Sequence, residues 1–274
     1  MEKATRKILD LLELDYVDLD GFTCCPEKTL VRNMDESLWK AVAARNVAVA
    51  EKAGCGLTMS CTGCYSVLKS VQSELKTYPR IKREINESLQ PLGLEFSGTQ
   101  PIRHLVEVLN SEIGPGRIKA LVTRPLKGKR IAVHAGCHLV RPSRAIHFDD
   151  PFKPTKYDQI VEWLGATSLE YSTKMFCCGG SLDRADQHSR ALNMARVKLD
   201  EVKALGADAI STTCPECFRV YDNNQFLLQR DNGVQYNIPV ITLQELLGLA
   251  FGMSPEELGM DGHKIETGAF MEGL

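Results

Sequence analysis

The chain has 274 residues, 43% of them hydrophobic, so it can bury a substantial core and form two domains. Its formal net charge of −2 leaves no basic excess to neutralise phosphates, which argues against a nucleic-acid-binding protein. No apolar run reaches the roughly 18–20 residues of a membrane helix, and residues 1–7 lack the apolar core of a secretory signal. We therefore expect a soluble, cytoplasmic protein with no membrane span and no nucleic-acid partner.

The first quarter of the chain alternates between helical patterns, short strand-like runs and cysteines. A glycine that closes a helix, followed by a short apolar run, is typical of a helix that leads into a strand. In chain order, the predicted elements are a helix containing Ile8, Leu11 and Leu12, a strand at 16–19, Cys24-Cys25, a helix at 36–52 closed by Gly54, a strand at 57–60, and Cys61-x-x-Cys64.

The segment from residue 65 to about 124 is charged and is predicted to be rich in helices. Residues 69–76 form an amphipathic pattern, and residues 101–109 are predicted to open a further short helix. This segment either docks a partner or shields the first sheet, and the sequence does not decide between these roles.

From residue 130 onward, the chain repeats the pattern of its first quarter and adds one strand at the start. In chain order, the predicted elements are a strand at 130–136 that leads to Cys137, a helix containing Ile160, Val161 and Leu164, a strand at 168–171, Cys177-Cys178, a long helix at 184–205 closed by Gly206, a strand at 209–213, and Cys214-x-x-Cys217.

The two halves are joined by segments that combine proline and glycine. These segments, 115–116 and 125–128, are typical of a hinge. The sequence therefore predicts a first cysteine-rich repeat with its helical insert at residues 1–125 and a second repeat at 126–274.

The cysteines of the two halves keep the same spacing. Cys24-Cys25 and Cys177-Cys178 are 153 residues apart, and so are Cys61-x-x-Cys64 and Cys214-x-x-Cys217. Shared spacing across so long a gap indicates an internal duplication. Sites in parallel α/β sheets tend to lie where the strands end. We therefore expect an α/β fold of two duplicated cysteine-rich domains related by pseudo-twofold symmetry, with the helical insert between them.

One strand and one cysteine of the second half have no counterpart in the first. A shift of 153 residues places the equivalents of the 130–136 strand and of Cys137 before Met1. A domain without its leading strand leaves a sheet edge bare. We therefore expect the native protein to start further upstream, and a first site with fewer ligands is the alternative.

Ten cysteines in a chain without an export signal indicate metal binding or redox chemistry, because the cytosol disfavours disulfides. Four or five thiolates without interleaved histidines suit zinc or an iron–sulfur cluster. Adjacent cysteines diverge along a strand, so they fit a multi-iron cluster that can be bound on two sides better than one tetrahedral ion. The spacing favours iron–sulfur clusters, with zinc and a purely thiol-based mechanism as the alternatives.

The residues around the cysteines resemble a known family. The duplicated cysteine-rich CCG signature is matched by Gly136-Cys137-His138, Cys177-Cys178-Gly179-Gly180, Cys214-Pro215-Glu216-Cys217, Cys24-Cys25-Pro26 and Cys61-Thr62-Gly63-Cys64-Tyr65. Within that family, the chain resembles the B subunit of the soluble heterodisulfide reductases of methanogenic archaea, especially at residues 62–65 and 147–154. The resemblance covers nearly the whole chain.

This resemblance implies two non-cubane [4Fe-4S] clusters and reduction of the coenzyme M–coenzyme B heterodisulfide between them, each sulfur being captured by one cluster. It implies a heterodisulfide reductase linked to dihydromethanophenazine or ferredoxin. The first cluster would take Cys24, Cys25, Cys61 and Cys64, with its fifth ligand missing here, and the second would take Cys137, Cys177, Cys178, Cys214 and Cys217. The implied partners are the iron–sulfur C subunit plus the flavin-containing A subunit, with hydrogenase or formate dehydrogenase as further partners. The chain itself has no Gly-x-Gly-x-x-Gly nucleotide motif.

Several charged residues lie close in sequence to these cysteines. His138, next to Cys137, is the best candidate to protonate a leaving thiolate, ahead of His134 and His188. Arginine forks suit the sulfonate, carboxylate and phosphate groups of the implied substrate, and the candidates to bind them are Arg141, Arg144 and Arg184. For each of these residues, a packed or solvated side chain is the alternative interpretation.

Cys55 lies outside the repeat, because residue 208 is an aspartate, so we expect this cysteine to be structural. Gly63, Gly179 and Gly180 are expected to let the backbone approach a cluster and to offer amide donors to its sulfurs.

Two other functions remain open. The chain is either an electron-relay subunit of a lactate, glycolate or fumarate oxidoreductase, in which the same motif passes electrons, or a zinc-stabilised scaffold. The colour of anaerobically purified protein distinguishes the zinc scaffold from the iron–sulfur proteins, because an iron–sulfur protein is brown and a zinc protein is colourless.

Overall fold

The computed structural model describes residues 1–274, apart from the side chain of Asn232. The chain divides into two compact units. Unit 1 comprises Met1–Tyr16, Leu109–Cys137 and Phe152–Leu274, and unit 2 comprises Val17–Val108 and His138–Pro151. None of the helices in the described part of the chain has the length and apolar character needed to span a membrane.

Unit 1 is built on a four-stranded parallel sheet with the strand order β4-β3-β5-β6. Its strands are β3 (Arg130–His134), β4 (Thr167–Ser168), β5 (Ala209–Thr212) and β6 (Val240–Thr242). Ile131, Ile210 and Ile241 have no exposed surface. A parallel sheet that is covered by helices on both faces accounts for this apolar character.

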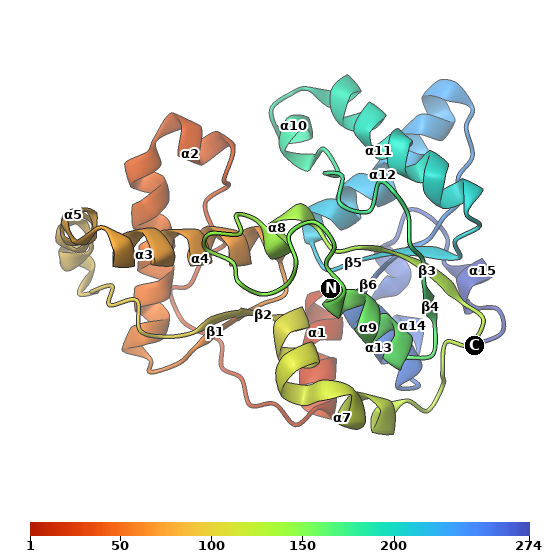
Figure 1. Ribbon diagram of the computed structural model, residues 1–274, viewed down its shortest axis with the longest axis horizontal. Coiled ribbons are helices and arrows are strands. Elements are labelled where there is room, and N and C mark those ends of the chain that lie inside the picture. The colour runs from red at the N-terminus through yellow and green to blue at the C-terminus, as the bar shows by residue number, and fades with distance from the viewer. The chain divides into compact units, whose positions relative to one another are not determined.

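Helices cover both faces of this sheet, with α11 and α12 on one side and α1, α9 and α13 on the other (Figure 1). The α-helices of unit 1 are α1 (Glu2–Leu11), α7 (Gly114–Leu121), α9 (Lys156–Trp163), α10 (Gly180–Arg184), α11 (His188–Ala204), α12 (Pro215–Asn232), α13 (Leu243–Ala250), α14 (Pro255–Leu258) and α15 (Gly268–Met271). Two further elements, the π-helix Val108–Ile113 and α8 (Cys137–Val140), begin or end at the unit boundaries.

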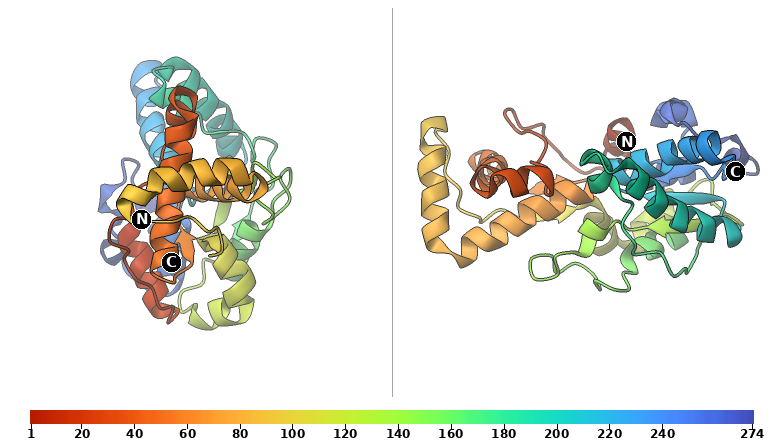
Figure 2. Two further views of the ribbon diagram at one scale, coloured as in Figure 1. Left: turned by 90° about the vertical axis from the view of Figure 1, so that its left-hand side faces the viewer. Right: turned by 90° about the horizontal axis from the view of Figure 1, so that it is seen from above.

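Unit 2 has a smaller sheet of two parallel strands, β1 (Leu57–Met59) and β2 (Ile102–His104). Its helices are α2 (Leu30–Met34), α3 (Glu36–Lys52), α4 (Thr62–Thr77), α5 (Pro79–Leu89) and α6 (Leu105–Glu107). The side chain of Asp35 caps α3 by accepting a hydrogen bond from the amide of Leu38 at 2.8 Å. Pro79 occupies the first position of α5, so a new helix turns away from α4 there (Figure 2).

The two units repeat the same helices at the predicted offset. A shift of 153 residues brings α11 onto residues 35–51, beside α3 at 36–52, and brings the start of α12 onto the start of α4. In unit 2, β1 precedes α4 and pairs in parallel with β2, which comes later in the chain. In unit 1, β5 precedes α12 and pairs in parallel with β6 in the same way. The prediction of a duplicated α/β fold is therefore confirmed. The pseudo-twofold relation and the boundary at residue 125 stay predictions. The compact units differ from the predicted repeats, since helix α1 packs on α13 and α14 and residues 1–16 therefore belong to unit 1.

Three local predictions were wrong. Residues 16–19 form no strand, and Val17 is 64% exposed, because nothing pairs with this segment. Residues 102–104 are strand β2 rather than the start of a helix, because they pair with β1. The long helix predicted from residue 184 begins at His188, because Asp186 has a positive φ of 60° and separates α10 from α11.

Candidate metal centres

Two strand ends bring the cysteines of unit 1 together. Cys137 follows β3, and Cys214 follows β5 and occupies the N-cap position of α12. Strand β4, which follows β3 in the chain, lies on one side of β3 in the sheet, whereas β5 and β6 lie on the other side. The carboxyl ends of β3 and β5 therefore flank the point where the strand order reverses, which is where open α/β sheets form binding crevices.

All five predicted ligands of this unit are linked through their thiols. Hydrogen bonds connect the thiol groups in the order Cys137, Cys177, Cys178, Cys217 and Cys214. The hydrogen bond between these two thiols lowers the pKa of Cys177 and raises the pKa of Cys137. Neighbouring hydrogen bonds and burial also raise the pKa values of Cys178 and Cys217. These thiols can all ionise together only if a cation compensates them.

Backbone amides face two of these cysteine sulfur atoms. Gly179 donates its amide to Cys177 Sγ and Gly180 donates to Cys178 Sγ, both at 3.4 Å. Gly179 has φ 91°, and a Cβ atom there would lie 3.0 Å from the backbone of Ala191, so a side chain does not fit. The glycines thus allow the loop to pass close to α11 while its amides point to sulfur.

His134 contacts one of the predicted ligands. Its Nε2 lies 3.3 Å from Cys217 Sγ, and its ring packs edge-on against Tyr221. Burial lowers the pKa of His134 to about 3, so the imidazole is neutral. A neutral ring can donate a hydrogen bond to a thiolate sulfur from Nε2.

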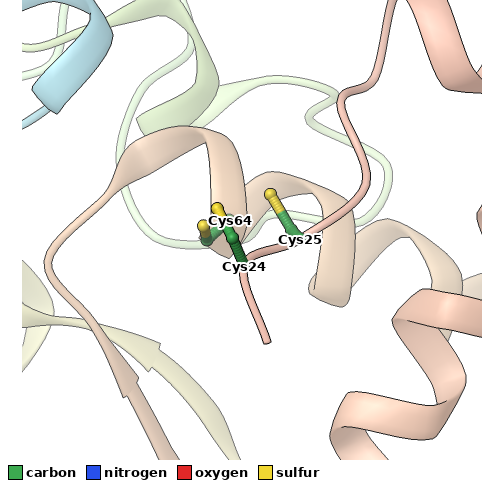
Figure 3. A group of neighbouring side chains, drawn as sticks. All are labelled: Cys24, Cys25 and Cys64. Atoms are coloured by element: carbon green, nitrogen blue, oxygen red, sulfur yellow. The ribbon is translucent and has the colours of Figure 1, made fainter. Parts of the chain in front are cut away.

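Unit 2 gathers the four cysteines of the first repeat in the same way. The sulfur atoms of Cys24, Cys25 and Cys64 lie within 4.8 Å of one another (Figure 3). Cys61 shares a hydrogen bond with Cys64 and occupies the N-cap position of α4. Its backbone angles of −111° and 122° match those of Cys214, −118° and 121°, so the two Cys-x-x-Cys motifs begin with the same backbone conformation.

The chemistry of both donor sets fits an iron–sulfur cluster. Each set consists of thiols alone, gathered at the N-terminus of a long helix whose dipole favours negative charge. Five linked thiols in unit 1 exceed the four that a tetrahedral zinc ion takes. The residues that would hold the clusters are therefore the nine predicted cysteines.

The other predicted site residues lie at various places. His138 is the second residue of α8 and is partly exposed. Arg141 donates from Nε and Nη2 to the carbonyl of Pro151, at 3.1 and 2.8 Å. Arg144 is exposed, and Cys55 is partly exposed, its thiol 3.4 Å from the carbonyl oxygen of Ala53.

Arg184 belongs to an ionic network beside the second Cys-x-x-Cys. It pairs with Glu216 at 2.7 Å, and Arg219 bridges Glu216 and Asp183. His188 pairs with Asp183 at 2.8 Å. Two charged residues were not predicted from the sequence. Arg219 escaped prediction because Asp183, one of the two carboxylates that it bridges, lies 36 residues before it in the chain. Lys198 is a buried lysine on α11 near the second cysteine set.

A family model, described as a cysteine-rich domain and named CCG, matches residues 1–69 and 131–220. These segments carry all nine predicted ligands. The chain belongs to the cysteine-rich CCG family.

Relatives and a solved structure extend this finding. The chain is 38% identical over 272 residues to the B subunit of a ferredoxin/F(420)H(2)-dependent CoB-CoM heterodisulfide reductase from Methanosarcina acetivorans, covering 99% of this chain and 90% of that one. It is 28% identical to an 8-methylmenaquinol:fumarate reductase membrane anchor subunit from Wolinella succinogenes, covering 97% and 92%. A crystal structure of a hypothetical protein from Helicobacter pylori matches with a TM-score of 0.76 at 16% identity. The match covers 97% of this chain and about half (48%) of the other, and it supports the fold.

Proposed function

We propose that this chain is the disulfide-reducing subunit of a heterodisulfide reductase, with the coenzyme M–coenzyme B heterodisulfide as its substrate. The observation that carries the proposal is the pair of thiol sets, each at the start of an equivalent helix. The family and the heterodisulfide reductase relatives support an iron–sulfur oxidoreductase.

The reaction needs two electrons and two protons to turn one disulfide into two thiols. When bound, two non-cubane [4Fe-4S] clusters supply one electron each and iron that can take a thiolate sulfur. Cys137, Cys177, Cys178, Cys214 and Cys217 hold the second cluster, and Cys24, Cys25, Cys61 and Cys64 hold the first.

The chain's other residues support this chemistry. The amides of Gly179 and Gly180 stabilise thiolate charge at Cys177 and Cys178. His138 is the proposed donor of a proton to a departing thiolate sulfur. Arg141, Arg144 and Arg184 are the proposed contacts for the anionic groups of the substrate, although Arg184 must first leave Glu216.

Electrons reach this chain from other subunits in the proposal, because the chain carries no nucleotide motif of its own. The relative from Methanosarcina acetivorans is named as one subunit of a larger reductase. We propose an iron–sulfur C subunit plus a flavin-containing A subunit as partners, with hydrogenase or formate dehydrogenase as further partners, in the cytoplasm.

The test is a thiol-release assay with anaerobically purified protein and a reduced one-electron dye. We expect two thiols to appear for each heterodisulfide consumed. Cys178→Ala and Cys25→Ala should each lose nearly all of this activity, whereas Cys55→Ala should keep it. Absence of thiol release from protein loaded with both clusters would contradict the proposal.

The relative from Wolinella succinogenes, which belongs to a fumarate reductase, favours one second candidate function, that of an electron relay. In that case the dye reduces the clusters, and they pass electrons to a partner protein but release no thiols from the disulfide. The same assay therefore separates the two functions.

A further inference from the structure

Lys198 is a lysine on α11 with no exposed surface. Its ammonium donates hydrogen bonds to the carbonyl oxygens of Thr173 and Lys174, the latter at 2.8 Å. It also lies over the ring of Tyr171, 5.1 Å from the centroid. Carbonyl dipoles and an aromatic face solvate an ammonium but leave its charge uncompensated.

No carboxylate in the described part of the chain lies within 4.0 Å of Lys198 Nζ. Lys174, the neighbouring buried lysine, differs in this respect. Its ammonium pairs with Asp158 at 2.7 Å and with Glu170 at 3.6 Å. Lys174 is therefore neutralised within the fold, whereas Lys198 in its protonated form brings a positive charge without a carboxylate partner into the interior of unit 1.

The anions near Lys198 include the predicted ligand sulfurs. Burial lowers the pKa of Lys198 to about 7, and the thiolates of Cys217, Cys178 and Cys177 act against this lowering. Glu201 acts in the same direction, but its carboxylate accepts the amides of Ser172 and Thr173. The hydrogen bonds to the carbonyls of Thr173 and Lys174 place the ammonium beside the segment that leads to Cys177 and Cys178.

The first repeat places a cation at the equivalent position. Arg45 on α3 is 153 residues before Lys198. Its Nη1 donates to Thr23 Oγ1 at 3.1 Å and to Asn46 Oδ1 at 3.0 Å. Thr23 directly precedes Cys24. In both repeats, a cation from the long helix thus binds the segment that leads to the adjacent cysteines, and only the second is fully buried.

We propose that Lys198 is a positioning residue that raises the reduction potential of a cluster held by the second cysteine set, by placing an uncompensated positive charge beside its thiolates. This inference rests on the proposed function only in that these cysteines hold a cluster. One-electron reduction adds one negative charge to the site. A buried cation stabilises that charge strongly because the interior screens it weakly.

The test is a redox titration of anaerobically purified holoprotein in the Cys25→Ala background, followed by electron paramagnetic resonance of the remaining cluster. Lys198→Gln keeps a donor for the two carbonyls but removes the charge, and Lys198→Met removes both. At the midpoint potential of the parent protein, we expect the ratio of reduced to oxidised cluster to fall about tenfold in both variants, equivalent to about 59 mV for one electron.

Two control variants isolate the effect of the buried charge. Lys198→Arg keeps the charge and should keep the midpoint near that of the parent. Lys203→Met removes an exposed lysine from the same helix, with the same change in net charge, and should also leave the midpoint unchanged, because water screens a surface charge.

An unchanged midpoint in iron-loaded Lys198→Gln or Lys198→Met would overturn this role for Lys198. Loss of the cluster from both variants, but not from Lys198→Arg, would assign the lysine a structural role and also overturn the inference. Failure of the wild-type protein to bind iron and sulfide would instead contradict the proposed function itself.

Discussion

At the scale of single residues, the nine predicted ligands differ in how far the protein shields them. Cys178, Cys214 and Cys217 are each only 6% exposed. Cys24 is exposed, and Cys25 is partly exposed. A thiolate that water and small molecules reach is more easily protonated, oxidised or stripped of its metal. The two sites should therefore differ in lability.

A chelator should reveal this difference directly. When anaerobic protein is treated with an excess of an iron chelator, we expect the first-repeat cluster to be lost several times faster than the second. The measurement is the spectroscopic signal of each cluster over time, assigned by Cys25→Ala and Cys178→Ala variants that each carry one cluster. Equal rates, or faster loss from the second repeat, would show that burial of the cysteines does not govern lability.

At the scale of elements, the loop that delivers Cys177 and Cys178 is fixed to helix α11. The carboxylate of Glu201 accepts the amides of Ser172 at 2.7 Å and Thr173 at 2.9 Å. Burial alone would raise the pKa of Glu201, but these hydrogen bonds outweigh it and lower the pKa to about 2. The loop is thus held in place before any metal binds.

Replacing Glu201 with Ala should free this loop. We expect the amides of Ser172 and Thr173 to exchange with solvent roughly tenfold faster, since a hydrogen bond to a charged acceptor contributes about 1.5 kcal/mol. Hydrogen–deuterium exchange measures this, and Glu162→Ala, a change at an exposed glutamate of α9, is the control. Unchanged protection of both amides would rule out the anchoring role.

The pH dependence of the same anchor follows from the lowered pKa. A carboxylate whose pKa is depressed on folding stabilises the folded state above its ordinary pKa of about 4.5 and loses this effect as the pH falls towards 2. In the wild type, protection of the two amides should decrease across this window, and in Glu201→Ala it should not change further.

The elements that the sequence predicted best are those with a strong local pattern. The helix predicted at 36–52 has the bounds of α3, and the strands β1, β3 and β5 lie within their predicted ranges. The errors lie where long-range pairing decides. Residues 102–104 become a strand because β1, more than forty residues earlier, pairs with them.

The candidate site was predictable where its residues repeat. The spacing of 153 residues identified eight of the nine cysteines that the structure gathers into two sets, and the CCG signature added Cys137. Lys198 and Arg219 escaped notice because charged residues on helices are usually solvated, and only the fold shows that one is buried and the other bridges two carboxylates.

At the scale of the whole molecule, the duplication provides two thiol sets, one in each compact unit, and each includes a Cys-x-x-Cys motif at the start of a long helix. A disulfide accepts two electrons and yields two thiolates, so two one-electron centres match its chemistry. The central claim is therefore that each set holds its own iron–sulfur cluster.

The iron and acid-labile sulfide content of anaerobically purified protein tests this claim most directly. We predict about eight irons and eight sulfides per wild-type chain, one four-iron cluster for each thiol set. Cys178→Ala and Cys25→Ala should each retain about four of both, and Cys55→Ala should match the wild type. Stoichiometric zinc without labile sulfide, or a full complement of iron in both Cys178→Ala and Cys25→Ala, would contradict the account.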